Sequence, residues 1–322
     1  MTQQGYPTAI KRRTPYAKLG FFGKMMRDIS KRPVLYLLFL PVLAYYVLFC
    51  YKPMYGALIA FTEYVPGNSF LADWQGLKHF ADFFNARDFG RLIKNTVYIS
   101  ASTIIWGFPA PIILALLMNE LRSKIFTRVI QTISYMPHFI SLVVVCSMIH
   151  QFVGSSGFIP QILYKLGLME KPVAMLGEAK YFVTIYVASG IWQEVGYGSI
   201  VYLAALAGVN AELYEAATID GANRWQQTLH VTLPGILPTI ITMLILRMGS
   251  VMSVGSDKII LLYNSSIYSV SDVISSYVYR KGIQSAQYSF STAVGLFNSV
   301  INCLMLVVVN TISRKVAETS LW

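Results

Sequence analysis

Six long apolar blocks constrain the fold of this chain more than any other feature of its sequence. Each block has about the 20 residues that a helix needs to cross a hydrocarbon core roughly 30 Å thick. Only helices or closed barrels satisfy all backbone polar groups in lipid, and these blocks are too long and uniform for barrel strands. We therefore predict an all-α integral membrane protein with six transmembrane helices. The predicted spans are Pro33–Tyr51, Asn95–Met118, Ile130–Val153, Phe182–Leu206, Ile236–Val254 and Thr292–Ile312.

Composition agrees with this prediction and argues against several other classes. The 322 residues are 55% hydrophobic and 13% charged, whereas a soluble domain carries about 25% charged residues. The cysteines Cys50, Cys146 and Cys303 lie in separate apolar blocks without a CxxC pair, and the histidines are scattered, so neither a disulfide framework nor a metal site is predicted. The net charge of +11 does not indicate nucleic acid, because basic residues flank membrane spans on the cytoplasmic side.

A basic cluster before the first span sets the predicted orientation. Its members are Lys11, Arg12, Arg13, Lys18, Lys24, Arg27, Lys31 and Arg32. Positive charge next to a span favours the cytoplasmic side, so both termini are predicted inside, with a cytoplasmic segment 1–32, a transmembrane domain 33–315 and a cytoplasmic tail 316–322. Within the first segment, Leu19, Phe22, Met26 and Ile29 recur at helical spacing. This pattern fits an amphipathic helix on the inner leaflet, or a simple topology anchor.

The most informative polar segment lies between the fourth and fifth spans, on the cytoplasmic side in this orientation. From Glu215 to Pro234 it reads EAATIDGANRWQQTLHVTLP. Good helix formers predict a helix over Ala211–Ile219 with Asn210 as its N-cap. Asp-Gly then indicates a turn. A second helix is predicted over Ala222–Val231, closed by Pro234.

This loop resembles the EAA loop of bacterial ABC-type importer permeases, which has the pattern E-A-A, two residues, D-G-A, and about ten residues to L-P. The matching residues are Glu215, Ala216, Ala217, Asp220, Gly221, Ala222, Leu233 and Pro234. The resemblance implies that a cytoplasmic coupling-helix loop, about 207–235, docks a separate ATPase. The family often has an aromatic residue where this chain has Thr228. Trp225 lies three residues earlier on the same helical face and could fill the ATPase groove instead.

Other segments look like parts of carbohydrate-uptake permeases, most of all those for complex oligosaccharides in Gram-positive bacteria. They are Asn95-Thr96, Pro137, the run 271–280, the run 293–297 and the run 310–315. The resemblance implies a multi-pass plasma-membrane subunit with a second, different but homologous permease, two cytoplasmic ATPase subunits and an extracellular solute-binding protein. ATP and Mg²⁺ would bind the ATPase partner, because this chain has no G-x-x-x-x-G-K-[ST] motif. No catalytic residue and no cofactor of its own are therefore predicted.

Two charged residues inside the predicted spans are candidates for the substrate pathway. Glu194 lies 13 residues before Ala207, and Arg247 lies 13 residues after Pro234, so both sit about 20 Å from the cytoplasmic end. They either line a shared solute pathway or form a structural ion pair. Trp192, Gln193 and Tyr197 lie nearby in the fourth span, and aromatic and polar side chains together suit the faces and hydroxyls of sugar rings.

The sequence thus predicts the permease subunit of an ATP-driven importer that moves an oligosaccharide by alternating access. The outer loops hold 11 basic and eight acidic residues, which weakly favours an anionic saccharide. One alternative is the same architecture carrying a non-sugar solute, such as a peptide or a polyamine. The other is an integral membrane enzyme, in which Glu212, Glu215 and Asp220 would form an acidic cluster.

Overall fold

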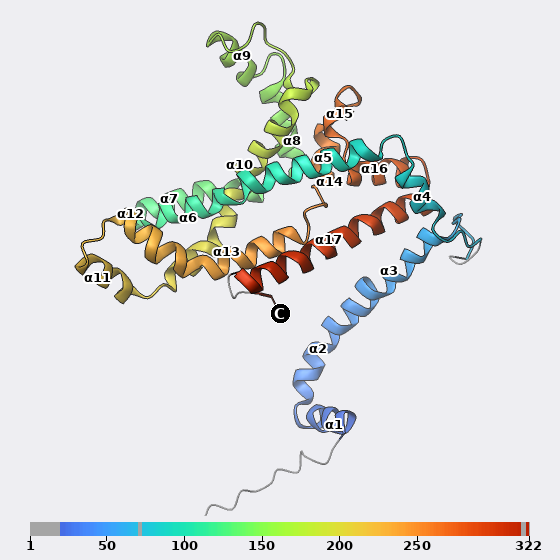
Figure 1. Ribbon diagram of the computed structural model, residues 1–322, viewed down its shortest axis with the longest axis horizontal. Coiled ribbons are helices and arrows are strands. Elements are labelled where there is room, and N and C mark those ends of the chain that lie inside the picture. Colours follow the sequence, from blue (N-terminus) through green and yellow to red (C-terminus); the bar gives the residue numbers. More distant parts are fainter. Residues whose placement is uncertain (1–19, 70–72, 317–319, 322) are drawn as a thin grey trace, which may run out of the picture. The chain divides into compact units, whose positions relative to one another are not determined.

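The computed structural model describes residues 20–69, 73–316 and 320–321 of the chain (Figure 1). By its internal contacts the chain divides into two units between Ala57 and Leu58. The helices of the first unit are α1 (Phe21–Lys31), α2 (Pro33–Tyr45), the π-helical turn Tyr46–Tyr51 and α3 (Lys52–Met54). A 3₁₀ helix, Tyr55–Phe61, follows.

Helix α1 covers most of the segment in which the sequence predicts an amphipathic helix. Lys18 and Leu19, which belong to that pattern, lie outside the described residues. The helix ends at Arg32, whose φ of −134° and ψ of 55° are not helical, as expected for a residue before a proline. Pro33 then occupies the first turn of α2, where its fixed φ suits helix initiation. Helix α2 is apolar on all sides, which is typical of a membrane span.

The second unit contains the remaining helices of the described chain. They are α4 (Lys78–Phe84), α5 (Phe89–Ser102), α6 (Pro109–Asn119), α7 (Lys124–Tyr135), α8 (Leu142–Val153), α9 (Phe158–Lys165), α10 (Ala179–Ala207), α11 (Ala211–Ile219), α12 (Arg224–Gln227), α13 (Leu233–Met248), α14 (Ser256–Leu262), α15 (Tyr268–Ser271), α16 (Ile274–Tyr279) and α17 (Tyr288–Val316). Several are joined end to end by π-helical turns, among them Thr103–Gly107 and Thr228–Thr232.

Within the described residues, five helical stretches are long and apolar enough to cross a membrane. They are Pro33–Phe61, Phe89–Asn119, Leu142–Lys165, Arg224–Met248 and Tyr288–Lys315. A sixth span is obtained when α10 and α11, which meet at 71°, are taken as one broken stretch. The structure therefore agrees with a chain of six spans, and it extends most of the predicted bounds.

The third span, predicted over Ile130–Val153, has different bounds in the structure and is interrupted near Pro137. Helix α7 ends at Tyr135, a 3₁₀ turn spans Met136–Phe139, and α8 begins only at Leu142. The break contains Pro137, which is buried and cannot donate the backbone hydrogen bond that a continuous helix requires. The candidate span accordingly runs from Leu142 into α9.

Helix α10 is the central element of the second unit and packs against α5, α6, α7, α13 and α15. Its Gly196 lies so close to α7 that an added Cβ would overlap the backbone of Ser134. Only glycine permits this approach of two helices, in the way that small residues do in membrane proteins generally. Helices α13 and α17 pack along one another (Figure 1), so the elements that follow α10 also belong to one bundle.

The segment between α13 and α17, which the sequence marks as a long outer loop, folds into short packed helices. Its Asp272 has no exposed side-chain surface and pairs with Arg280 and Arg91. The amide of Asn95 on α5 donates to the backbone oxygens of Ser269 (3.1 Å) and Asp272 (2.9 Å). These bonds bring together two segments far apart in the sequence and anchor the outer segment to the bundle.

Candidate functional site

The first candidate site is the segment that joins α10 to α13, which contains α11 and α12. Helix α11 has the predicted bounds, and the Asn210 side chain accepts a hydrogen bond from the backbone N–H of Glu212 at 3.0 Å. This is the N-cap that the sequence predicts. The hydroxyl of Tyr214 lies 3.0 Å from that of Thr232, so α11 is tied back to the start of α13.

Gly221 ends α11 in a left-handed conformation, with φ of +78°. The N–H of Ala222 donates to Ala217 O at 2.9 Å, and the N–H of Gly221 donates to Thr218 O at 3.1 Å. This pair of bonds is the Schellman motif, which satisfies the last carbonyls of a helix and favours glycine. The Asp-Gly turn of the sequence therefore has a specific backbone role.

Helix α12 begins later than the sequence predicts, because Asn223 caps it. The backbone N–H of Gln226 donates to Asn223 Oδ1 (2.9 Å), and the N–H of Asn223 donates to Gln226 Oε1 (2.8 Å). These reciprocal bonds form a capping box. Helix α12 opens a continuous helical stretch, Arg224–Met248.

The prediction that Pro234 closes this helix is wrong. Pro234 lies in the first turn of α13, where a missing N–H is tolerated. The π-helical turn Thr228–Thr232 directly precedes it. Such a turn interrupts the regular i to i−4 backbone hydrogen bonds of the helix, in which proline cannot take part because it has no N–H. The part of the polar segment from Arg224 onward is therefore continuous with the fifth span, as one helical stretch.

Most of the residues with which the sequence predicts ATPase docking lie on the surface of this segment. Glu215, Ala216, Asp220, Gly221, Trp225 and Pro234 are exposed, whereas Ala217, Ala222 and Leu233 are partly buried. Ile219 is 86% and Trp225 70% exposed, which is unusual for large apolar side chains in a polar loop. Arg224 Nη1 bonds Glu120 Oε2 at 2.8 Å and links α12 to the end of α6.

The second candidate site is a cavity of about 500 Å³ inside the bundle. Its walls come from the π-helical turn Thr103–Gly107 and from α6, α8, α10, α13 and α14. Gln193, Glu194 and Tyr197 of α10 line it together with Arg247 of α13. The structure thus brings together four of the five residues that the sequence offers for a substrate pathway. Trp192, which is 45% exposed, is not among the lining residues.

Glu194 contacts His138 rather than Arg247. Its Oε2 lies 3.0 Å from His138 Nδ1. The imidazole in turn stacks on the Tyr197 ring, with 3.8 Å between ring centroids and 2° between planes. Among the described residues, no carboxylate lies within ion-pair distance of the Arg247 guanidinium. The cavity therefore combines an aromatic stack, a partnered acid and an unpaired cation.

Lys258 also lines this cavity, and sequence reasoning missed it. Its side chain is buried, and Nζ donates to Tyr186 O at 3.0 Å while lying 5.0 Å from the centroid of the Tyr186 ring. Burial lowers the pKa of Lys258 to about 8, against a partial opposing effect of Cys146 and Glu194. The sequence signal that could have indicated a buried Lys258 is its position directly before the apolar run IILL. For His138, the corresponding signal is its position next to Pro137 within an apolar block.

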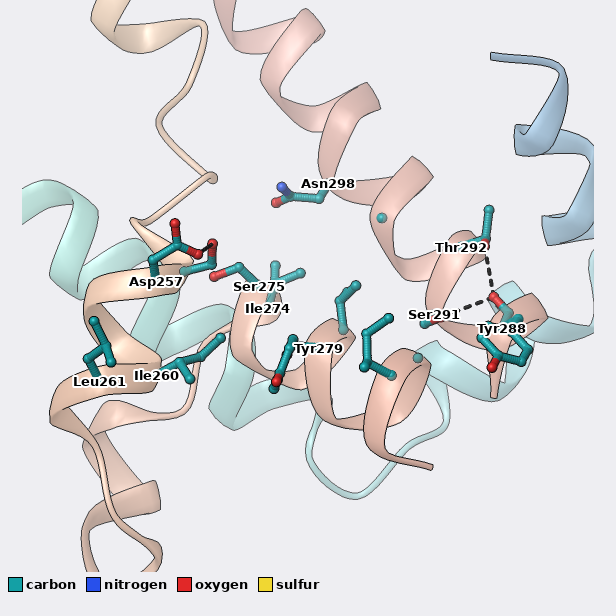
Figure 2. A pocket seen from close by; sticks show the side chains of 15 residues that line it. Asp257, Ile260, Leu261, Ile274, Ser275, Tyr279, Tyr288, Ser291, Thr292 and Asn298 are labelled. Atoms are coloured by element: carbon teal, nitrogen blue, oxygen red, sulfur yellow. Dashed lines mark hydrogen bonds between the residues drawn. The ribbon is translucent and has the colours of Figure 1, made fainter. Parts of the chain in front are cut away.

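A third hollow, of about 740 Å³, lies between α14, α16 and α17 (Figure 2). Asp257 and Ser275 lie at one end of it, and Tyr288 and Thr292 lie at the other. Asp257 is the one charged residue among the described lining side chains. The charged residue that lines this hollow is therefore acidic, whereas the cavity described above is lined by the cations Arg247 and Lys258.

Metal binding has no support in the described part of the chain, which holds no group of three or more His, Cys, Asp or Glu side chains arranged to bind an ion. The cavity around Arg247 and Lys258 instead presents hydrogen-bond donors. Its chemistry suits the binding of a polar or anionic solute.

Comparison with known proteins agrees with this architecture. A family model described as "Binding-protein-dependent transport system inner membrane component" matches residues 107–318. Protein LplB of Bacillus subtilis (strain 168) is 41% identical over 97% of this chain and 98% of its own length. The polygalacturonan/rhamnogalacturonan transport system permease protein YteP of the same organism is 37% identical over 93% of both.

Solved structures are also similar. The crystal structure of a bacterial ABC transporter involved in the import of the acidic polysaccharide alginate contains a chain that is 41% identical, with a TM-score of 0.84, covering 91% of this chain and 99% of that one. A second alginate transporter structure, with an alginate pentasaccharide-bound periplasmic protein, gives a TM-score of 0.85. The chain is thus a membrane-embedded permease of the family of binding-protein-dependent transport system inner membrane components.

Proposed function

We propose that this chain is a permease subunit that imports an oligosaccharide by alternating access, driven by a separate ATPase. The observation that carries the proposal is one continuous connection between two sites. Helix α10 and the stretch Arg224–Met248 contribute Glu194 and Arg247 to the cavity, and both lead into the exposed segment that contains α11. A partner that moves this segment would move two walls of the cavity.

The exposed segment has the properties of a docking surface. Trp225 and Ile219 present apolar area beside the charges of Glu215 and Asp220, and the caps at Asn210, Gly221 and Asn223 hold the segment rigid. We infer that ATP-hydrolysing subunits dock here with their own ATP and Mg²⁺. Docking of this kind requires the segment to lie in the cytoplasm, which is the side that the basic N-terminal cluster also favours.

An oligosaccharide is supported as the solute by the names of similar proteins and by the cavity. The transporters of known structure import alginate or hold a periplasmic protein bound to it. In this chain, the stacked rings of His138 and Tyr197 offer an apolar face, and neighbouring polar groups can bond hydroxyls. We further propose an extracellular binding protein that delivers the sugar and a second, homologous permease subunit that completes the pore.

The deciding experiment compares two exposed tryptophans. Trp225 is 70% and Trp106 is 69% exposed, but only Trp225 lies in the docking segment. In membranes that contain the intact importer, Trp225→Ala should lose co-purifying ATPase subunits and ATP-dependent sugar uptake, whereas Trp106→Ala should retain both. Equal retention in the two variants would refute docking at this segment.

The same preparation distinguishes the alternatives. Uptake of a peptide or a polyamine, but of no saccharide, would identify an importer for a different solute. A chemical reaction catalysed by the purified chain without any ATPase would identify a membrane enzyme, for which nothing in the cavity argues.

A further inference from the structure

Lys258 is a buried cation without a counter-ion. Its side chain is almost fully buried, and no carboxylate among the described residues lies within ion-pair distance of Nζ. Glu194 acts on it only from a greater distance. Burying a charge without a partner is costly, and in membrane proteins such a residue marks a functional site by default.

The one acid of the cavity is already engaged elsewhere. Glu194 pairs with His138 at 3.0 Å, and Arg247 has no acidic partner in the described part of the chain. Two cations, Lys258 and Arg247, therefore line a single cavity of about 500 Å³ that holds one acid, and this acid contacts an imidazole. This arrangement has a deficit of negative charge, which an incoming anion would supply.

We propose that Lys258, together with Arg247, binds the carboxylates of the transported saccharide and so makes this permease specific for acidic oligosaccharides built from uronic acids. The inference rests on the proposed import of an oligosaccharide and deepens it. It assigns the choice between acidic and neutral sugars to a residue that lies outside the predicted spans.

The geometry of Lys258 fits this role. An ammonium group has three donors, and one of them is occupied by Tyr186 O at 3.0 Å. Two remain for a carboxylate, and hydrogen bonds between charged groups are about twice as strong as neutral ones. A neutral sugar would offer hydroxyls alone and would leave the cation buried without compensation. The stacked rings of Tyr197 and His138 can meanwhile contact the apolar face of a pyranose.

The hollow of about 740 Å³ that Asp257 lines supports, by contrast, the assignment of carboxylate binding to Lys258 and Arg247. Its charged lining residue is Asp257, which would repel a carboxylate. The neighbouring residues Asp257 and Lys258 thus line different hollows, and only the one with Lys258 and Arg247 suits an anionic solute.

The test uses the importer with its own partner subunits in proteoliposomes. Uptake of an acidic oligosaccharide, a galacturonic acid oligomer, is compared with uptake of the same oligomer after reduction of its carboxyl groups to alcohols. Lys258→Met should lower the acidic-to-reduced uptake ratio at least tenfold, and Lys258→Arg should largely preserve it. Lys281→Met, which removes a nearby lysine that does not line the cavity, should leave the ratio unchanged.

Three outcomes separate the two proposals. If no variant and no wild-type importer takes up either saccharide, the proposed function fails. If wild-type protein imports saccharides but Lys258→Met leaves the ratio unchanged or lowers both uptakes equally, the inference is overturned while the proposed function stands. A tenfold or larger fall in the ratio supports both.

A pH comparison keeps the inference testable even where Lys258→Met does not assemble. With a pKa of about 8, the ammonium of wild-type protein loses its proton between pH 7 and pH 9, so the acidic-to-reduced uptake ratio should fall over this range. In Lys258→Arg the guanidinium stays charged, and the fall should be absent. Tyr186 and Glu194 of α10 and Cys146 of α8, which also act on Lys258 or face it, are present in both proteins. Identical pH profiles would overturn the inference.

Discussion

Arg280 and Asp272 form a bidentate ion pair, with Nη1–Oδ1 and Nη2–Oδ2 distances of 2.6 and 2.7 Å. The carboxylate has no exposed surface, and Arg91 of α5 lies 3.3 Å from its Oδ2. The Ser276 hydroxyl donates to Oδ1 at 2.8 Å. This pair holds the junction of α15 and α16 against α5.

Removal of Arg280 should therefore destabilise the protein strongly. Arg280→Met leaves the buried Asp272 with Arg91, at the longer distance, as its cationic partner, and breaking a buried pair from one side costs about 3–5 kcal/mol. We expect a marked drop in apparent unfolding temperature of the protein in nanodiscs. Lys281→Met removes the same charge one residue later, where no carboxylate of the described residues lies within ion-pair distance, and should have a much smaller effect. Equal drops in the two variants would contradict this role of the pair.

Gly196→Ala should disrupt the packing of α10 on α7. Its Cβ would overlap the backbone of Ser134, and overpacking against backbone costs on the order of 3 kcal/mol. Gly295→Ala on α17 is the matched control, because nothing lies within 4 Å of its added Cβ and alanine favours a helix by about 0.5–1 kcal/mol over glycine. The yield of monodisperse protein in size-exclusion chromatography should fall for Gly196→Ala alone. A normal yield would show that the two helices can separate without penalty.

Gly221 should tolerate asparagine better than alanine. Its φ of +78° costs an L-residue about 1–2 kcal/mol, while asparagine adopts this conformation more readily. Because nothing lies within 4 Å of an added Cβ, the effect comes from the backbone alone. We expect Gly221→Ala to retain less ATPase on co-purification than Gly221→Asn. If the two variants behave alike, the left-handed conformation is not what the segment needs.

The burial of Lys258 also predicts how stability depends on pH. Its pKa falls from 10.5 to about 8 in the folded protein. Between these values the unfolded chain binds more protons than the folded one, so the contribution of Lys258 to stability rises with pH. Wild-type protein should therefore gain in unfolding temperature relative to Lys258→Met between pH 7 and pH 10. Tyr186, Glu194 and Cys146, which act on Lys258 or contact it, are present in both proteins. A constant difference across this range would exclude the effect.

The spans could be predicted from the sequence because the length of an apolar block is a local property. The effect of a proline within or beside such a block is not local. Pro137 breaks the third span, whereas Pro234, which the sequence suggests as a helix end, lies in the first turn of α13. The difference depends on the π-helical turn before Pro234 and on the burial of Pro137, and neither can be read from residue types.

The cavity residues also divide into those that local sequence features reveal and those that depend on the packing of distant segments. Glu194 and Arg247 were identified as candidates because charges within apolar blocks are rare. Lys258 was missed because it follows the fifth block in the chain, and its burial depends on how α14 packs against α8 and on the bond to Tyr186. The partner of Glu194 was missed for a related reason: the contact between His138, in the break after α7, and Glu194 of α10 depends on how the two helices pack.

One turn of helix α14 presents opposite charges to two different hollows. Asp257 and Lys258 are consecutive, and consecutive residues of an α-helix point about 100° apart. The sign of charge inside each hollow is therefore set by the angular phase of α14, and not by its composition. A one-residue insertion in the seven residues between Met248 and Ser256 that turned the helix by this angle would place Asp257 where Lys258 lies, while preserving every side chain of α14. Length variation in this short connection should consequently be more harmful to transport than most substitutions within it.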